Sequence, residues 1–327
     1  MNPAPTPTPQ SLPEATAART LRHVVADDAH TAAVELDGWQ QRYQQLTPGA
    51  FRAEMSQVTY GDVHVFREQT SQSLLEEGEA ARGYIALALP DAQCQGGWFS
   101  GYAMDGQTLL CGRSMAMRTP RELDLAGLTV PLPALQRAVA LAGGEPARLE
   151  RMPPVRPVTK IAGREFRALL LSVLATAAID TEVFSNRFVE SAMRDALLLA
   201  AATALVGEGN AGNERLPTTP ARRRLVADAY QMIRSAPDQP WSILSLCERL
   251  GVSRRTLQYS FNEVTGLSPL DFVRAVRMNG VRQALRNGAA DSVGAAAANF
   301  GFQHLPRFAA QYRAFFGELP SATLARR

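Results

Sequence analysis

Residues 241–261 read WSILSLCERLGVSRRTLQYSF, and this stretch predicts two short helices joined by a tight turn. Apolar residues recur at helical spacing before Gly251, which is well placed to end a helix in the left-handed conformation. Ser253 is a good N-cap for the next helix, and Leu257 and Phe261 direct that helix back onto the first. Two short helices joined by a glycine-containing turn form a helix-turn-helix, which docks its second helix in the major groove of DNA.

The second of these helices carries the side chains that we expect to contact DNA. Its polar face holds long donor side chains of the kind that reaches base edges and phosphates. A solvated basic face is the alternative interpretation, if charge alone is considered. The candidate contacts of this first unit are Ser253, Arg254, Arg255, Gln258, Tyr259 and Asn262.

The same layout recurs farther along the chain. Apolar residues at helical spacing lead to Gly301, and Phe308 and Tyr312 follow on a further predicted helix. Residues 269–286 predict a helix long enough to bridge the two units, so the pair would address major-groove segments about 34 Å apart. One such unit alone is open to being an accidental helical hairpin, whereas two with one layout indicate a tandem DNA-binding domain.

The second unit predicts weaker sequence reading than the first. Pro306 has no backbone donor, and Leu305 and Ala310 have no polar group, so its helix presents fewer groups to base edges. We expect its remaining polar side chains to hold phosphates. These candidate contacts are Gln303, His304, Arg307 and Arg313.

Charge separates this segment from the rest of the chain. Residues 218–327 contain 15 arginines, no lysine and seven acidic residues, a net charge of +8, whereas the remainder has 19 basic and 24 acidic residues. A basic segment attached to an acidic one suggests that only the former faces a polyanion. We therefore predict four parts: a disordered tail over 1–20, an effector-sensing and dimerisation domain over 21–206, a Gly- and Asn-rich linker over 207–217, and a DNA-binding domain over 218–327.

The amino-terminal part predicts a different architecture, so that the fold class is α+β. Short alternating runs between residues 51 and 129, with a hairpin signature at Tyr60-Gly61-Asp62, predict a small antiparallel β barrel or sandwich. Flanking helices are expected over 31–46, 132–141, 164–179 and 188–206. The last two carry apolar stripes that would either close the barrel or form the seam of a homodimer. The stripes are Leu169, Leu170, Val173 and Leu174, then Ala192, Ala196, Leu199 and Ala200.

A barrel or sandwich of this kind offers a natural pocket for a small molecule. If that effector were a small amine, a carboxylate and aromatic rings would hold it. Each such residue is also an ordinary component of a strand surface or core. The candidates are Glu54, Tyr60, Phe66, Glu68, Trp98 and Tyr102.

Over residues 222–325 the chain resembles the AraC/XylS family. The matching segments are Ser253-Arg254-Arg255-Thr256-Leu257-Gln258 with Phe261, Thr265-Gly266-Leu267-Ser268-Pro269, Asn299-Phe300-Gly301-Phe302, and Phe315-Phe316-Gly317 with Pro320-Ser321. Within that family it is most similar to regulators of ethanolamine utilisation, through Gly301-Phe302 followed by His304-Leu305 and the ending Leu319-Pro320-Ser321-Ala322-Thr323-Leu324. Looser similarity extends to Trp39-Gln40-Gln41, Leu46-Thr47-Pro48-Gly49 and Val65-Phe66-Arg67-Glu68.

This resemblance implies a cytoplasmic, ligand-responsive transcription activator of a catabolic operon. Its partners would be double-stranded DNA, RNA polymerase and a small-molecule effector, with a homodimer as a further possibility. Ethanolamine and adenosylcobalamin are the first candidate effectors, and no cofactor is required. A regulator of the same fold that responds to a different metabolite is the alternative.

Other classes of function find little support in the sequence. Four histidines show no metal-ligand spacing, three cysteines are scattered, and no nucleophile elbow, P-loop or dinucleotide fingerprint is present. We therefore expect no catalytic and no metal site. A purely structural adaptor would leave the basic segment unexplained. The sequence also shows no signal-peptide pattern and no apolar run of membrane-spanning length, so we expect no membrane association.

Overall fold

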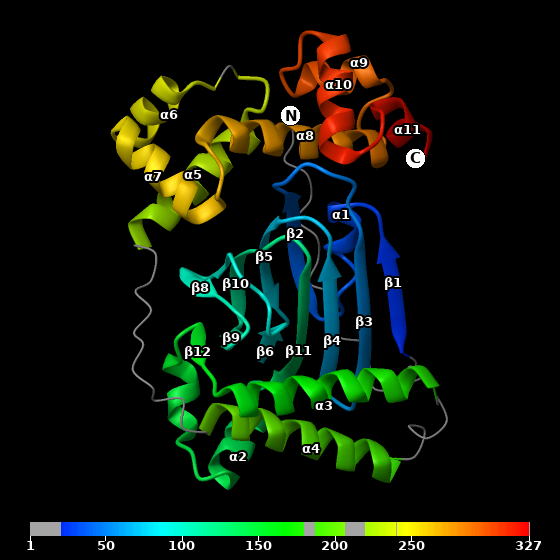
Figure 1. The fold of residues 1–327 in the computed structure, drawn as a ribbon, viewed down its shortest axis with the longest axis vertical. Helices are drawn as coiled ribbons and strands as arrows, with labels where there is room; N and C mark the ends of the chain where they lie inside the picture. Colours follow the sequence, from blue (N-terminus) through cyan, green and yellow to red (C-terminus); the bar gives the residue numbers. More distant parts are fainter. Residues whose placement is uncertain (1–20, 180–186, 207–219, 240, 327) are drawn as a thin grey trace.

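The computed structural model describes residues 21–179, 187–206, 220–239 and 241–326. A β-sandwich occupies the middle of the molecule, a pair of long helices covers one end, and a helical domain is seated on the other (Figure 1). The predicted tail and linker lie outside the described residues. No helix in the described ranges combines the length and the apolar character needed to cross a membrane.

Two antiparallel sheets form the sandwich, which corrects the barrel alternative. They share no strand pairing among the described residues, and apolar alternation along a strand is the same in a barrel and a sandwich. The seven-stranded sheet has the order β1 (Arg22–Ala26), β3 (Ala53–Tyr60), β4 (Val63–Thr70), β11 (Leu123–Pro131), β6 (Tyr84–Pro90), β9 (Thr108–Gly112) and β12 (Val155–Pro157). The five-stranded sheet has the order β2 (Trp39–Gln45), β5 (Leu74–Ala80), β10 (Ser114–Arg118), β7 (Gly97–Phe99) and β8 (Tyr102–Met104).

The prediction of a helix over residues 31–46 was wrong. Only α1 (Ala29–Ala32) is helical there, and Gly38 at φ 77° turns the chain into β2. Strand β2 pairs with β5 along its whole length, from Trp39 opposite Ala80 to Gln45 opposite Leu74. Because this pairing partner lies far along the chain, a local periodicity cannot reveal it, and tertiary pairing overrides helix propensity.

Helices cover the outer face of the seven-stranded sheet. They are α2 (Leu132–Leu141), α3 (Lys160–Ile179) and α4 (Arg187–Val206), with a short 3₁₀ helix at Pro146–Arg151. The stripe predicted on α3 packs on the sheet, since Leu170, Val173 and Leu174 are buried in one core with strand residues. The stripe predicted on α4 does not: Ala192, Ala196 and Leu199 are exposed, and Leu197, Leu198, Ala201, Ala202 and Leu205 are buried instead.

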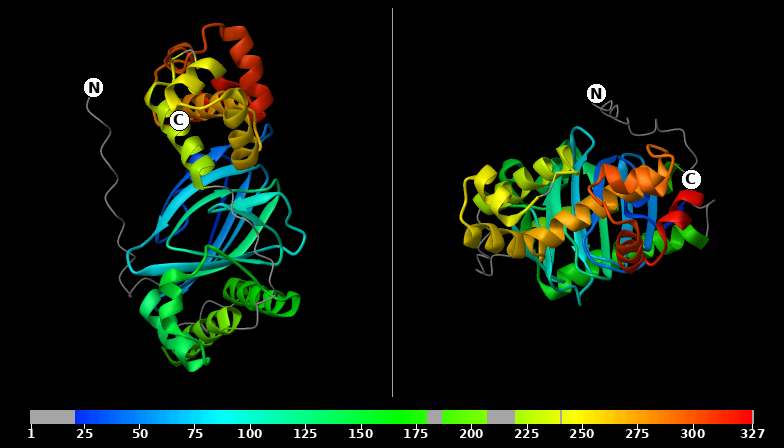
Figure 2. Two further views of the ribbon diagram at one scale, coloured as in Figure 1. Left: turned by 90° about the vertical axis from the view of Figure 1, so that its left-hand side faces the viewer. Right: turned by 90° about the horizontal axis from the view of Figure 1, so that it is seen from above.

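The carboxy-terminal domain is helical, as predicted. It consists of α5 (Pro220–Ser235), α6 (Ile243–Leu250), α7 (Arg254–Thr265), α8 (Pro269–Arg286), α9 (Val293–Asn299), α10 (Leu305–Phe316) and α11 (Pro320–Ala325). The last of these was not predicted. Helix α8 runs between two helical groups (Figure 2), and its two ends contribute to two separate apolar cores.

The helical domain contacts the sandwich through both apolar and polar groups. Leu46, Leu75 and Trp98 of the sandwich belong to the apolar core built around α5, α7 and α8. Asn279 of α8 accepts from the backbone N–H of Gln45 at 3.2 Å and donates to its carbonyl oxygen at 2.9 Å. The outer side of the five-stranded sheet is therefore a face on which the helical domain rests.

Candidate nucleic-acid interface and effector cavity

Helices α6 and α7 form the first predicted unit, and local chemistry fixes both ends of the turn between them. Gly251 ends α6 in the left-handed conformation at φ 65°. Ser253 caps α7, because its hydroxyl accepts from the backbone N–H of Thr256 at 3.1 Å. Leu246, Leu257 and Phe261 hold the pair together in a common core. The turn thus presents the amino-terminal end of α7 to solvent.

The candidate DNA contacts of this unit lie together on the open face of α7. Arg254, Arg255, Gln258 and Asn262 are exposed. Tyr259 is 60% exposed, and the guanidinium of Arg222 on α5 lies 5.7 Å from its ring centroid. Arg222 was not among the candidate residues named from the sequence, although it belongs to a run of three arginines at residues 222–224.

Helices α9 and α10 repeat the arrangement in the second predicted unit. Ser292 caps α9, and the imidazole Nδ1 of His304 caps α10 by accepting from the backbone N–H of Arg307 at 3.2 Å. Gln303, His304, Arg307 and Arg313 are all exposed. Because the ring of His304 serves as the cap, it has only its second nitrogen to offer to a phosphate.

The arginines of the helical domain include two contrasting groups. Members of the first group are ion-paired: Arg222 with Glu263, Arg274 with Asp271, Arg282 with Asp28 and Glu318, Arg286 with Asp27, and Arg326 with Asp27 and Glu318. On α7 and α10, within the described residues, Arg254, Arg255, Arg307 and Arg313 make no ion pair and are exposed. Charges left unpaired on an open surface are available to phosphates.

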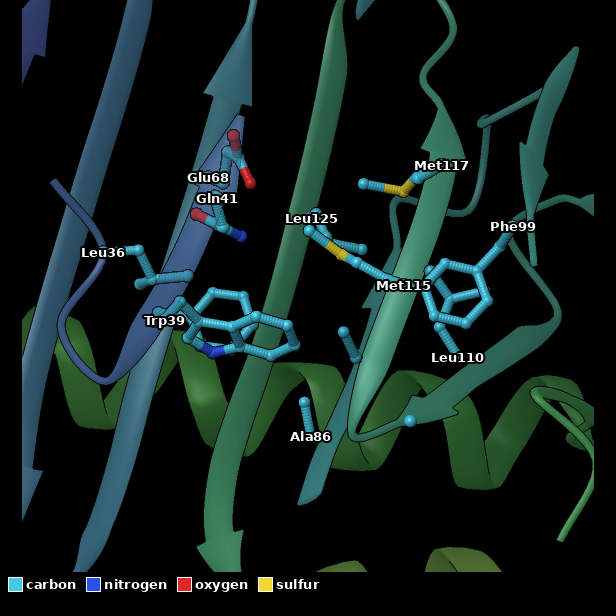
Figure 3. Close-up of a pocket in the computed structure, with 13 residues that line it drawn as sticks. Leu36, Trp39, Gln41, Glu68, Ala86, Phe99, Leu110, Met115, Met117 and Leu125 are labelled. Atoms are coloured by element: carbon cyan, nitrogen blue, oxygen red, sulfur yellow. The ribbon is translucent and has the colours of Figure 1, made fainter. Parts of the chain in front are cut away.

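A small cavity lies between the two sheets of the sandwich (Figure 3). It has a volume of about 30 Å³, which is room for roughly two water molecules. Apolar and sulfur-containing side chains form most of its wall, and no lining residue is basic. The lining residues are Leu36, Trp39, Gln41, Phe66, Glu68, Ala86, Ala88, Phe99, Leu110, Gly112, Met115, Met117 and Leu125.

The structure brings two of the six candidate pocket residues to this cavity, namely Phe66 and Glu68. Tyr60 is buried in the core between the seven-stranded sheet and α3 and α4, and burial raises its pKa to about 12. Trp98 packs in the core shared with the helical domain. Tyr102 packs at the margin of the sandwich core, and Glu54 is ion-paired with Arg52 on the surface.

A buried acidic cluster adjoins the cavity and was only partly visible in the sequence. Glu68 is 2% exposed and Glu76 is not exposed at all. Burial raises the pKa of Glu68 to about 7 and raises that of Glu76 well above its ordinary value, with the nearby Glu68 carboxylate as a second cause. Burial and the two carboxylates also raise the pKa of Tyr43, whose hydroxyl donates to Gln41 Oε1 at 3.1 Å. Glu76 was not named as a candidate residue, because the sequence did not predict strand β5.

Residues 246–326 match the model of a helix-turn-helix domain family. The chain is 37% identical over 97 residues to "XylDLEGF operon transcriptional activator 2" of Pseudomonas putida, a match that covers 29% of this chain and 62% of the relative. It is 32% identical over 107 residues to the "Probable thc operon regulatory protein" of Rhodococcus erythropolis, covering 32% of each. The chain therefore spans less than two thirds of the length of these curated relatives.

A solved structure is similar to about a third of this chain. The crystal structure of a probable AraC family transcriptional regulator from Rhodopseudomonas palustris is 36% identical, with 32% of this chain and 96% of that chain covered. The TM-score of this match is 0.29, so the superposition itself adds no argument to the sequence identity.

Proposed function

The carboxy-terminal domain of this chain belongs to the AraC/XylS family, and from that premise we propose that the protein is a sequence-specific DNA-binding transcription regulator. The observation that carries this proposal is the division of the arginines. Arg282 and Arg286, which face the sandwich, are ion-paired with Asp28 and Asp27, whereas the arginines of α7 and α10 are exposed and unpaired among the described residues. This arrangement suits a polyanion that meets both helices.

Helices α7 and α10 would make different kinds of contact with DNA. Arg255 and Gln258 lie on the exposed face of α7 and are assigned to base edges, since arginine pairs with guanine and glutamine with adenine in the major groove. Arg254 and Arg307 are assigned to phosphates, which fix the register of the protein on the duplex. Helix α10 offers few base-reading groups, because Leu305, Pro306 and Ala310 occupy its exposed face.

The proposal extends to a ligand-responsive activator of a catabolic operon. Two named relatives support it, since their names describe an activator and a regulator of operons. Ethanolamine and adenosylcobalamin remain the first candidate effectors, and RNA polymerase is the expected partner at the promoter. The cavity in the sandwich has a volume of about 30 Å³, so it admits only a compound of a few heavy atoms, and a corrinoid would need another site. A regulator that responds to a different metabolite is the second candidate, because the named relatives control other operons.

DNA binding is tested by fluorescence anisotropy of the full-length protein on a duplex from the promoter beside its gene. Affinity is measured over a series of salt concentrations. If five to eight phosphates are neutralised, the plot of log K against log salt has a slope of roughly −5 to −7. A slope near zero, or no binding at low salt, would remove the proposal.

The effector is tested by calorimetry of the full-length protein with ethanolamine and adenosylcobalamin, singly and together. A reporter driven by the adjacent promoter then shows whether binding raises transcription. Absence of heat and of induction would leave the DNA-binding function in place and exclude these two effectors. A response to a different metabolite would favour the second candidate.

A further inference from the structure

Three strands from two sheets place the acidic cluster inside the sandwich. Tyr43 of β2 lies opposite Glu76 of β5, and Glu76 lies opposite Met117 of β10, so these side chains form one row on the inner face of the five-stranded sheet. Glu68 comes from β4 of the other sheet, opposite Met55 and Leu125, which are core residues. The next inner row, with Gln41 and Met115, lines the cavity. Glu68 therefore lines the cavity, and Glu76 lies in the adjoining row, opposite the lining residue Met117.

The Tyr43 hydroxyl is a hydrogen-bonding neighbour of Glu68, and beyond it the carboxyl groups of Glu68 and Glu76 lack, among the described residues, the partners that buried charges ordinarily have. Both oxygens of Glu76 and Oε1 of Glu68 are buried without a hydrogen-bond partner. A buried carboxylate without compensation is costly, and two close together repel each other. No arginine, lysine or histidine lines the cavity, so the ligand-free pair avoids a buried net charge by keeping protons, as the raised pKa values of Glu68 and Glu76 indicate, and a bound cation would take the place of those protons.

We propose that this cavity binds a small organic ammonium compound, with Glu68 and Glu76 as its counter-charges. An ammonium group has three donors, which suits the three unpartnered carboxylate oxygens. The rings of Trp39, Phe66 and Phe99 would surround the short carbon stem and add cation–π attraction. Met115 and Met117 are flexible side chains that adjust to the shape of the ligand.

The available groups favour this ligand class over its alternatives. An organic acid would meet two carboxylates and no basic side chain. A metal ion would need more ligands, and no three His, Cys, Asp or Glu side chains gather as a metal site in the described residues. The volume of about 30 Å³ limits the ligand to a few heavy atoms.

The same strands connect this site to the helical domain. Leu75 precedes Glu76 on β5, points to the other side of the sheet and packs in the core of α5, α7 and α8. Gln45 follows Tyr43 on β2 by two residues and donates to the carbonyl oxygen of Phe315 at the end of α10. A ligand that draws Glu68 and Glu76 together would shift strands that carry contacts to both DNA-reading units. This step rests on the proposed function, because it makes the ligand the effector.

The test uses three compounds of nearly equal size: ethanolamine, ethane-1,2-diol and glycolate, which end in a cationic, a neutral and an anionic group. Ethylamine and propylamine extend the cationic series. Binding to the full-length protein is measured by calorimetry. We expect at least one of the three amines to bind at least tenfold more tightly than the diol and glycolate. Equal or tighter binding of the diol or of glycolate would overturn the proposal, as would the absence of binding by all three amines.

Variants then locate the site. Glu68→Gln and Glu76→Gln keep the shape and remove the charge, and each is expected to weaken amine binding at least tenfold. Glu79→Gln is the matched control, because Glu79 lies on the same strand with an exposed side chain. Wild-type affinity in both cavity variants would contradict the assignment. If either variant fails to fold, the comparison of the compounds on the wild type still decides the ligand class.

Duplex binding is measured on the same preparations without ligand. Intact DNA binding with no amine binding would overturn this inference and leave the proposed function standing. Absence of duplex binding by the wild type would instead contradict the proposed function.

Discussion

At the scale of single residues, the same chain uses charged groups in two opposite ways. Arg254 and Arg255 remain exposed and unpaired on α7, which suits an external polyanion. Glu68 and Glu76 are buried without hydrogen-bond partners for three of their oxygens, which suits an internal cation. Ionising the buried pair is unfavourable without a cation beside it, whereas the exposed arginines are well hydrated and gain free energy on DNA through release of counterions. Groups of this kind are therefore the best guides to function in this structure.

The buried carboxylates predict an unusual dependence of stability on pH. A carboxyl whose pKa is raised on folding keeps its proton in the native state after the unfolded chain has lost it, so stability falls as pH rises. For Glu68 this window runs from about 4.3, the ordinary value, to the native value of about 7. We expect the free energy of unfolding to drop by a few kcal/mol between pH 5 and pH 8 because of this pair.

Denaturant unfolding of the wild type and of Glu76→Gln at each pH checks this expectation. The difference between the two proteins removes the contribution of other groups, such as His64, whose pKa is lowered by burial and which acts in the opposite direction. The variant should lose less stability than the wild type across the window. Parallel curves for the two proteins would show that Glu76 is ionised in the native state without penalty.

Arg255 and Arg307 are predicted to affect DNA binding differently. Arg255→Ala should cost about 1–3 kcal/mol on the preferred sequence and relax the preference at one base pair. Arg307→Ala should weaken binding to all sequences alike and reduce the salt slope by about one unit. Anisotropy on specific and random duplexes separates the two effects. Equal losses on both duplexes for Arg255→Ala would refute the assignment of that residue to a base.

At the scale of elements, the sequence was informative where local signals suffice. Helices α6 to α10 follow from apolar spacing, from N-caps that are serine in α6 to α9, and from glycine stops after α6, α7 and α10, and each of these signals acts within a few residues. Strands β2 and β5 were misread or missed, because each is defined by its pairing with the other. The prediction of the pocket residues was incomplete for the same reason. Phe66 and Glu68 lie on a strand with a clear hairpin signature, whereas Glu76 and Tyr43 lie on the two strands that the sequence did not reveal.

The turn between α6 and α7 gives a prediction at this scale. An alanine at Gly251 would meet nothing within 4 Å, so its only penalty is the left-handed backbone. We expect Gly251→Ala to destabilise the domain by about 1–2 kcal/mol. The control is Gly294→Ala in helix α9, where a methyl group meets Leu305 at an ordinary 3.7 Å. That change should be neutral or stabilising by up to about 1 kcal/mol. Denaturant unfolding of the two variants measures both effects, and equal destabilisation would contradict this view of the turn.

At the scale of the whole molecule, a buried ion-pair network joins the helical domain to the sandwich. The guanidinium of Arg282, which is 5% exposed, bonds the carboxylate of Asp28 and, at 2.7 Å, that of Glu318. Its partner Asp28 is also the N-cap of α1 in the sandwich domain. Together with the Asn279–Gln45 pair, this network fixes the orientation of α8 on the sheet edge. Helices α7 and α10 are thus held in a fixed orientation relative to the domain that contains the cavity.

Removing the charge of Asp28 should therefore lower the free energy of unfolding of the whole protein. The variant Asp28→Asn would still cap α1, because asparagine and aspartate cap helices equally well. Loss of one partner from a buried pair costs about 3 kcal/mol, which should appear in denaturant unfolding of this variant. Asp27→Asn is the control, since Asp27 is half exposed and its pairs with Arg286 and Arg326 are worth less than about 1 kcal/mol. Equal effects of the two changes would show that the network does not join the domains.

Selection from a randomised duplex pool with the full-length protein tests whether α7 and α10 contact base edges in DNA. Successive rounds of binding and sequencing are carried out with the wild type and with Arg255→Ala. We expect the wild type to enrich a site with two parts about one helical turn apart, one strongly and one weakly defined. We expect Arg255→Ala to lose preference within the strongly defined part only. Recovery of no common sequence by the wild type, or of the same sequence by both proteins, would contradict these expectations.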